Sequence, residues 1–160
     1  MTFDNSKTII SLRIKLFAVT VIALGWLTLA YVGKVIKFPF LGMDDVFWTL
    51  ILVAAWFIVA FLPMFLSYQY ISYSDEGGKI VFRYFSAGMI GGRKNSVEIS
   101  KQSFSGYEVE KKFFGLILSI ILFQRFKEGV AKYPPVYISA LTRIERDKIF
   151  RSLNMLSGKV

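Results

Sequence analysis

The sequence offers few side chains for acid–base or nucleophilic chemistry. It contains no cysteine and no histidine, which excludes thiolate chemistry, a Ser–His–Asp arrangement and a His-based metal site. Two acidic pairs remain, Asp44 with Asp45 and Glu108 with Glu110. The first pair supplies too few ligands for a cation and is placed to cap a helix, and the second shares the solvated face of a predicted strand. We therefore expect no catalytic residue, no metal, no cofactor and no small-molecule substrate.

Basic residues are the other chemically suggestive group, because the net charge is +9. Arg93 and Lys94 lie in a predicted loop and Lys79 lies where a hairpin loop meets the next strand, so all three could contact anionic lipid headgroups. A solvated basic loop without a ligand is the alternative. The glycine-rich stretch 88–92 lacks the spacing of a phosphate-binding loop. The basic residues are not gathered with aromatic residues on a platform, so we expect no nucleic-acid binding.

Two uncharged apolar runs, Leu16–Gly33 and Val46–Leu66, indicate that the chain is anchored in a membrane. A bilayer core of roughly 30 Å needs about 20 helical residues. We predict a transmembrane hairpin over residues 16–66, with helices at about 16–36 and 46–66. Residues 1–15 are expected to be a solvated lead-in that starts the first helix early, with a short amphipathic interfacial helix as the alternative.

The distribution of lysine and arginine predicts the orientation of this hairpin. Lys7, Arg13 and Lys15 precede the first run, and only Lys34 and Lys37 stand in the short connection. Basic residues near membrane ends stay in the cytoplasm. We expect an integral membrane protein with both termini and the C-terminal domain in the cytoplasm.

The apolar runs carry no charge within them, which favours an anchor over a transporter or channel. Small and aromatic residues within them predict helix–helix packing at Ala18, Gly25, Trp26 and Trp56. The helices would pack on each other or on helices of a partner, either another membrane protein or a second copy of the chain.

After residue 66 the apolar period changes from helical to two, which predicts a β domain over residues 67–160. Gly77 and Gly78 supply the positive φ of a hairpin turn. The apolar run 113–124 is expected to be a strand buried on both faces, with an interfacial or re-entrant membrane segment as the alternative. A capping-box pattern begins a final amphipathic helix at about 142–156. Strands are expected at 67–74, 79–85, 95–100, 104–111, 113–124 and within 129–139.

The order of these elements resembles the bacterial pleckstrin-homology (PH)-like family, over roughly residues 67–156. The resemblance rests on the hairpin at 77–79, the apolar strand 116–123 and the helix 141–156, behind two membrane helices as in many members. It implies a membrane-anchored α+β protein of the inner (cytoplasmic) membrane of a bacterium. Its domain would be a bent antiparallel barrel that the C-terminal helix plugs through Ile149, Phe150 and Leu153. Eukaryotic PH domains bind phosphoinositides at the first hairpin loop.

In this chain that loop carries Asp75 and Glu76 beside Lys79, so Arg93 and Lys94 are the better candidates for headgroup contacts. A folded domain without catalytic chemistry favours a non-enzymatic protein-interaction module at the membrane. A partner strand could pair with residues 104–111 or with the edge marked by Pro134 and Pro135. Peripheral sensing of anionic lipid headgroups is the alternative function.

Overall fold

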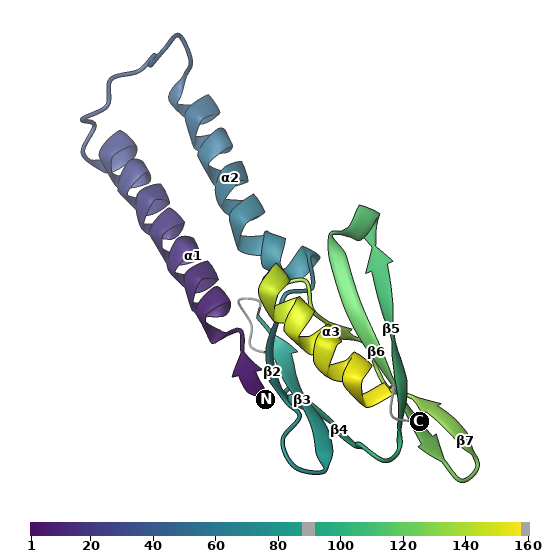
Figure 1. Ribbon diagram of the computed structural model, residues 1–160. Helices are drawn as coiled ribbons and strands as arrows, with labels where there is room; N and C mark the ends of the chain where they lie inside the picture. Colours follow the sequence, from purple (N-terminus) through teal and green to yellow (C-terminus); the bar gives the residue numbers. More distant parts are fainter. Residues whose placement is uncertain (88–91, 158–160) are drawn as a thin grey trace. The chain divides into compact units, whose positions relative to one another are not determined.

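The computed structural model describes residues 1–87 and 92–157, and the chain forms two compact units (Figure 1). The helical unit is Ile10–Pro63, and the β unit combines Met1–Ile9 with Met64–Val160. The helices of the chain are α1 (Ser6–Leu27), continued by the π-helical turn η1 (Thr28–Val32), then α2 (Asp45–Phe65) and α3 (Arg143–Ser157). The strands are β1 (Thr2–Asp4), β2 (Gln69–Ser74), β3 (Lys79–Ser86), β4 (Asn95–Ser100), β5 (Phe104–Lys112), β6 (Ile117–Phe126), β7 (Gly129–Lys132) and β8 (Val136–Tyr137).

Ser6–Val32 and Asp45–Phe65 are long and apolar enough to cross a membrane. Only 6% of each apolar window is buried, whereas the core helix of a soluble domain would bury most of it. Within the helical unit the indole nitrogen of Trp56 donates to the Thr20 hydroxyl at 2.9 Å, and the hydroxyls of Tyr31 and Thr49 are 2.7 Å apart. The two exposed apolar helices are consistent with the predicted membrane spans.

The first sheet of the β unit is antiparallel, in the order β1-β2-β3-β4. Its inner residues alternate with outer ones, as in β3, where Ile80, Phe82 and Tyr84 are buried. Gly77 has φ +68° in the turn between β2 and β3, as predicted from the glycine pair. The predicted strands 67–74, 79–85 and 95–100 therefore match the observed ones within about two residues.

Strand β1 differs from the expected solvated lead-in. Its residues pair antiparallel with β2, so that Thr2 lies opposite Ser74 and Asp4 opposite Ser72. The fully buried Asn5 extends this pairing past β1. Its side-chain nitrogen donates to the Gln69 carbonyl at 2.9 Å, and its side-chain oxygen accepts from the Ile71 amide at 2.8 Å. The helix does start early, at Ser6, but the first residues belong to the sheet.

The second sheet has the order β5-β6-β7, with β8 pairing β6 beside β7. The expected α+β class and the order of elements are confirmed. The expected barrel is not closed: within residues 1–87 and 92–157 no strand of one sheet pairs with a strand of the other. The turn 101–103 between β4 and β5 carries the chain from one sheet into the other, which interrupts the strand pairing there.

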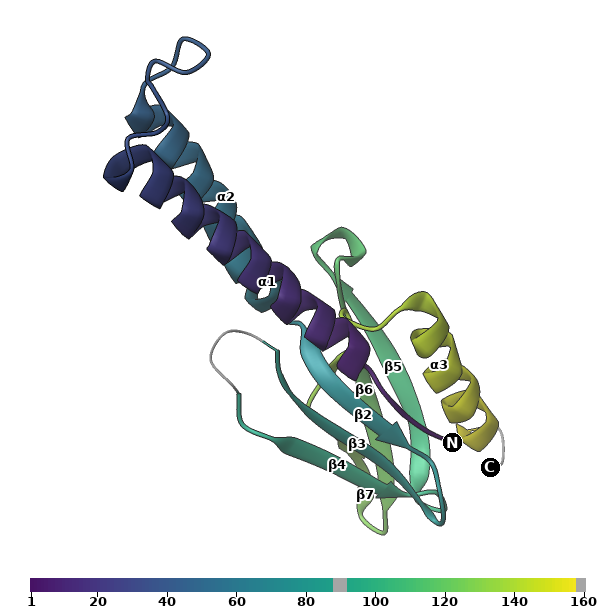
Figure 2. The same cartoon turned by 90° about the vertical axis from the view of Figure 1, so that its left-hand side faces the viewer.

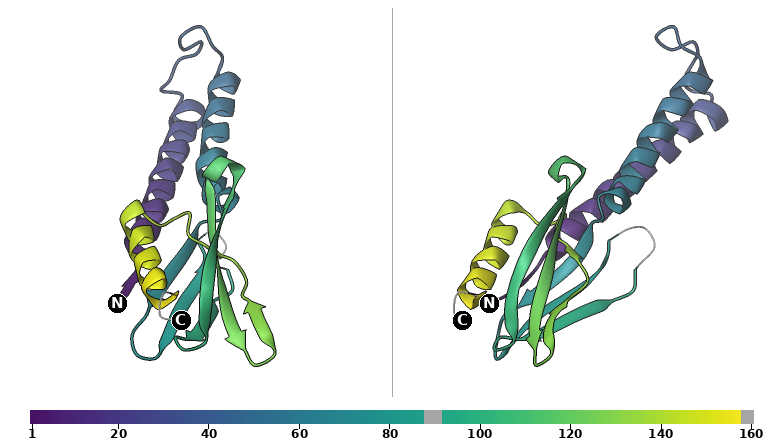
Figure 3. Two further views of the ribbon diagram at one scale, coloured as in Figure 1. Left: turned by 45° about the vertical axis from the view of Figure 1, so that its right-hand side comes forward. Right: turned by 90° about the vertical axis from the view of Figure 1, so that its right-hand side faces the viewer.

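The core lies between the sheets and α3, which packs along β5 (Figures 2 and 3). Ile149 and Leu153 of α3 are fully buried, in the positions expected for the plug. Phe150 is only partly buried and stacks on Tyr107, with ring centroids 5.9 Å apart. Ile144, on the apolar face of the predicted helix, is instead 69% exposed, because the first turn of α3 extends past the core.

The apolar run 113–124 divides into two parts. Residues from Ile117 onward form β6, with Ile117, Ile120, Ile121 and Leu122 buried, so the predicted strand is confirmed there. The strand prediction is wrong for residues 113–116. They form the turn η2 (Phe113–Gly115) and its exit at Leu116, and they point their apolar side chains out of the core.

Candidate functional site

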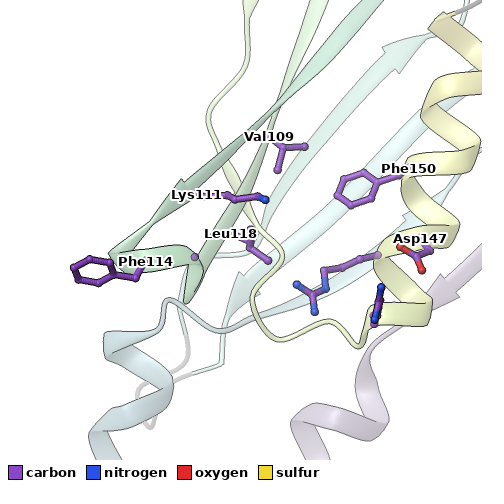
Figure 4. Close-up of a pocket in the computed structure, with 9 residues that line it drawn as sticks. Val109, Lys111, Phe114, Leu118, Asp147 and Phe150 are labelled. Atoms are coloured by element: carbon purple, nitrogen blue, oxygen red, sulfur yellow. The ribbon is translucent and has the colours of Figure 1, made fainter.

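A groove of about 660 Å³ lies between the first turns of α3 and the β5–β6 hairpin (Figure 4). This volume falls within the range of small-molecule sites, roughly 300–1,000 Å³. The groove is open to solvent along one side, so its occupant would remain partly exposed. The lining residues are Val109, Lys111, Phe114, Gly115, Leu118, Arg143, Arg146, Asp147 and Phe150.

A capping box fixes the start of α3 beside this groove. The Thr142 amide donates to the Glu145 carboxylate at 2.8 Å, and the Glu145 amide donates to the Thr142 hydroxyl at 3.3 Å. These bonds satisfy free N–H groups of the helix start. Because the cap already occupies these N–H groups, side chains would hold an anion in the groove. Arg143 and Arg146 lie one turn apart behind the cap and are placed to do so.

The charge of the groove is strongly positive. The lining includes three cations, Lys111, Arg143 and Arg146, and one carboxylate, that of Asp147. Among the described residues, none of the three cations forms an ion pair. The Nε atom of Arg146 is buried and has no hydrogen-bond acceptor in the described part of the chain. A buried donor without a partner is costly, and an anionic ligand would satisfy it.

Apolar side chains line the groove between these charges. Val109 comes from β5, Leu118 from β6 and Phe150 from α3, where Phe150 points toward β5 (Figure 4). The stack of Phe150 on Tyr107 is held in place by the Tyr107 hydroxyl, which donates to the Asn154 side chain at 2.8 Å. The groove therefore combines an apolar wall with cations, a pattern that suits an amphiphilic anion.

The structure separates the three predicted headgroup contacts. Arg93 and Lys94 are exposed beside the last residues of β3, and Lys94 lines a smaller hollow of about 350 Å³ with Arg83. Lys79 begins β3, so seven residue steps of about 3.3 Å place it roughly 23 Å away along the strand. There Lys79 pairs with Glu98 at 3.7 Å. The glycine-rich stretch between β3 and Arg93 falls largely at residues 88–91, outside the described part of the chain.

The predicted helix-packing residues also divide into two groups. Trp56 bonds to Thr20, and Trp26 packs on Trp48 with ring centroids 6.4 Å apart, so both tryptophans lie between α1 and α2. Ala18 and Gly25 are exposed, and a Cβ built on Gly25 would meet nothing within 4 Å. The structure therefore does not place these two small residues at the contact between the helices.

Neither acidic pair forms part of the groove. The Asp45 carboxylate accepts from the Val46 amide at 2.9 Å at the start of α2, and Glu110 pairs with Lys112 at 3.5 Å. Residues 1–87 and 92–157 contain no group of three or more acidic side chains that could hold a metal ion.

The sequence contains one sign of the groove. Cations are unfavourable near the N-terminus of a helix and favourable near its C-terminus. In α3, Arg143 and Arg146 nevertheless stand at the start, beside the acidic Glu145, and the last turn has no basic residue. These two arginines gain nothing from the helix dipole, so their position marks them as candidate ligands. Lys111 carries no comparable signal.

The opposite end of the β unit holds a polar network. The hydroxyls of Tyr73 and Ser152 are 2.6 Å apart, and Ser152 and the amino group of Met1 both donate to the Asp75 carboxylate. Burial raises the pKa of Tyr73 to about 12. Burial opposes ionisation of Asp75, but the hydrogen bonds from Met1 and Ser152 prevail and lower its pKa below its usual value.

Comparison of the chain with protein-family models, with curated proteins and with solved structures finds no match.

Proposed function

We propose that this protein is a membrane-anchored, non-enzymatic module that binds anionic lipid headgroups in the groove between α3 and the β5–β6 hairpin. One observation carries the proposal: an open, partly apolar groove is lined by three cations that form no ion pair with any described residue. Sensing of anionic lipid headgroups, the alternative function predicted from the sequence, is thus the first candidate. Its binding residues become Lys111, Arg143 and Arg146.

The chemistry of a phospholipid headgroup matches this arrangement. Guanidinium groups bind phosphate oxygens through paired N–H donors, and the buried Nε of Arg146 is a donor that needs such an acceptor. The glycerol and upper acyl carbons would contact Val109, Leu118 and Phe150. A free inorganic anion would leave this apolar wall unused, so the groove favours a lipid.

The PH-like assignment of the β unit is part of the proposal. Two antiparallel sheets enclose one core, and a C-terminal helix packs over it through Ile149 and Leu153. This order agrees with the PH-like plan, although the sheets are not closed. The groove lies at α3 and β5, away from the β2–β3 turn at which eukaryotic PH domains bind phosphoinositides.

The same proposal places both termini and the β unit in the cytoplasm, at the inner membrane. The sequence supports this through Lys7, Arg13 and Lys15, which precede the first span, against the two lysines of the connection. The β unit would then face the leaflet surface that carries negative potential. Lipid composition at that surface would set the occupancy of the groove.

Native mass spectrometry of the full chain, released from nanodiscs of phosphatidylcholine with a minority of phosphatidylglycerol, tests this function. The wild type should retain phosphatidylglycerol preferentially. The double variant Arg143→Glu with Arg146→Glu should lose that preference about tenfold or more, since each basic residue contributes about 1 kcal/mol. The matched control, Arg125→Glu with Lys127→Glu, makes the same charge change at exposed positions of the β6–β7 hairpin and should behave as wild type.

Equal loss of preference in both double variants would show that only net charge matters and would overturn the groove assignment. Loss in neither variant would overturn it as well.

A protein-interaction module remains the second candidate, and a specific edge favours it. All four residues of β7 are exposed, and in the described residues β7 pairs only with β6. Pro134 and Pro135 follow after one residue, Tyr133, and the outer edge of β7 is open to a partner strand. Stoichiometric co-purification of another protein with wild type, lost on replacing Val130 and Ala131 by proline, would support this function.

A further inference from the structure

The β5–β6 hairpin ends in an apolar tip, which we define as residues 113–116. Its three large side chains face solvent: Phe113 is 57% exposed, Phe114 is fully exposed and Leu116 is 61% exposed. Exposed single apolar residues are ordinary, but three within four positions at the end of one hairpin form a patch. The core of the β unit does not use these side chains.

The backbone of the tip holds the two phenylalanines in an uncommon conformation. Phe113 has φ +49° and Phe114 has φ +55°, the left-handed region that bulky residues rarely adopt. The following Gly115 has φ +89°, a conformation that glycine adopts without strain. This conformation turns the ring of Phe114 away from α3 (Figure 4). Strain of this kind persists where a function uses the resulting geometry.

The neighbours of the tip indicate what covers it. Phe113 packs against Phe65, with ring centroids 5.5 Å apart. Phe65 is the last residue of α2, a helix long and apolar enough to span a membrane. Lys111 and Lys112 immediately precede the tip, as basic residues flank apolar segments that sit among lipid headgroups. Apolar rings beside the end of a span, with lysines behind them, fit a bilayer surface.

We propose that the apolar tip inserts into the interfacial layer of the membrane from which α2 emerges. Phe113, Phe114 and Leu116 would lie at the boundary between headgroups and acyl chains, with Lys111 and Lys112 at the phosphates. The inserted hairpin would hold the mouth of the groove at headgroup level. The inference rests on the membrane anchoring in the proposed function, and not on headgroup binding by the groove.

The absence of cysteine from the chain permits a clean test by single-site labelling. Phe114→Cys is labelled with an environment-sensitive fluorophore in the full chain, in nanodiscs of phosphatidylcholine that contain doxyl-labelled lipid. The control, Val130→Cys on β7, replaces a residue of similar character, 57% exposed, at the other end of β6. The label at position 114 should shift to the blue and be quenched roughly twofold or more by shallow doxyl groups, as for an interfacial segment. The label at position 130 should show neither effect.

Leu116→Cys provides a second labelling site in case the substitution at position 114 alters the turn. Equal, unquenched signals at positions 114, 116 and 130 would overturn the inference. A blue shift at position 114 without doxyl quenching would also overturn it, in favour of contact with a second copy of the chain. Quenching that appears only when anionic lipid is added would assign the approach to charge and not to apolar insertion.

The double variant Arg143→Glu with Arg146→Glu separates this inference from the proposed function. Headgroup preference should fall in that variant, while quenching at position 114 in phosphatidylcholine should be unchanged. Loss of quenching together with headgroup preference would show that the tip has no independent affinity for the membrane and would overturn the inference.

Discussion

The two ends of the β unit differ in whether their polar groups have partners and their apolar side chains are buried. At the Asp75 end, Tyr73, Ser152 and Asp75 are joined by hydrogen bonds and reach the amino group of Met1. At the Phe114 end, where β5 turns into β6 and α3 begins, Phe114 is fully exposed, and a buried donor of Arg146 finds no acceptor among residues 1–87 and 92–157. One end is complete within the chain, and the other leaves groups unsatisfied.

This difference has a physical consequence for where stability and binding are located. A satisfied, buried network contributes to the free energy of unfolding, because breaking it leaves polar groups without partners. Unsatisfied donors and left-handed phenylalanines destabilise the folded state, and an external partner would offset that cost. Substitutions at the two ends should therefore have separable effects on stability and on membrane contact.

The largest expected effect is a loss of stability at alkaline pH that originates at the Asp75 end. The pKa of Tyr73 is raised from 10.0 to about 12, so folding favours the protonated phenol. This contribution, about 3 kcal/mol, is fully present below the unfolded pKa and is lost as the pH rises through 12. Urea unfolding of the full chain in nanodiscs, read by pulse proteolysis of the β unit, should show the decline begin near pH 10.

Tyr73→Phe is the control for this prediction, because lysines titrate in the same range. The variant should lose about 1 kcal/mol at neutral pH, for its missing hydrogen bond to Ser152, and should decline less than wild type between pH 10 and 12. Parallel declines in the two proteins would contradict the account of the buried phenol.

A smaller effect is expected when one glycine at each end of the β unit is replaced by alanine. Gly77 has φ +68° and Gly115 has φ +89°, and a Cβ at either position would meet nothing within 4 Å. Substitution by alanine should therefore cost about 1 kcal/mol in both cases, through backbone strain alone. Only Gly115→Ala should also reduce phosphatidylglycerol retention severalfold, since it displaces the tip and one side of the groove. Equal retention in the two variants would remove the functional distinction between the ends.

Most of the strand pattern was predictable from the sequence because it is local. The alternation of Ile80, Phe82 and Tyr84 and the glycine pair at 77–78 determine the β2–β3 hairpin without any distant residue. Strand β1 was not predictable in this way. Its pairing with β2 joins residues about 70 positions apart, and Asn5 shows no local sign that its side chain will bond to Gln69 and Ile71.

The candidate site was less predictable than the fold. Lys79, Arg93 and Lys94 were grouped by charge and loop position, but strand length separates the first from the other two. The groove combines β5, β6 and the start of α3, and its composition depends on packing that the sequence does not display. The two arginines at the start of α3 were the one readable sign. Within residues 113–124, periodicity alone could not distinguish the exposed tip from the buried strand that follows.

Hydrogen exchange of the full chain in nanodiscs tests the central claim, that the Phe114 end meets the membrane and the Asp75 end does not. Amides of residues 109–112 and 143–150, which border the groove, should exchange more slowly when phosphatidylglycerol is added to phosphatidylcholine nanodiscs. Amides of residues 74–79 and 125–132 should exchange at an unchanged rate. Protection spread equally over both ends, or confined to residues 74–79, would contradict the account.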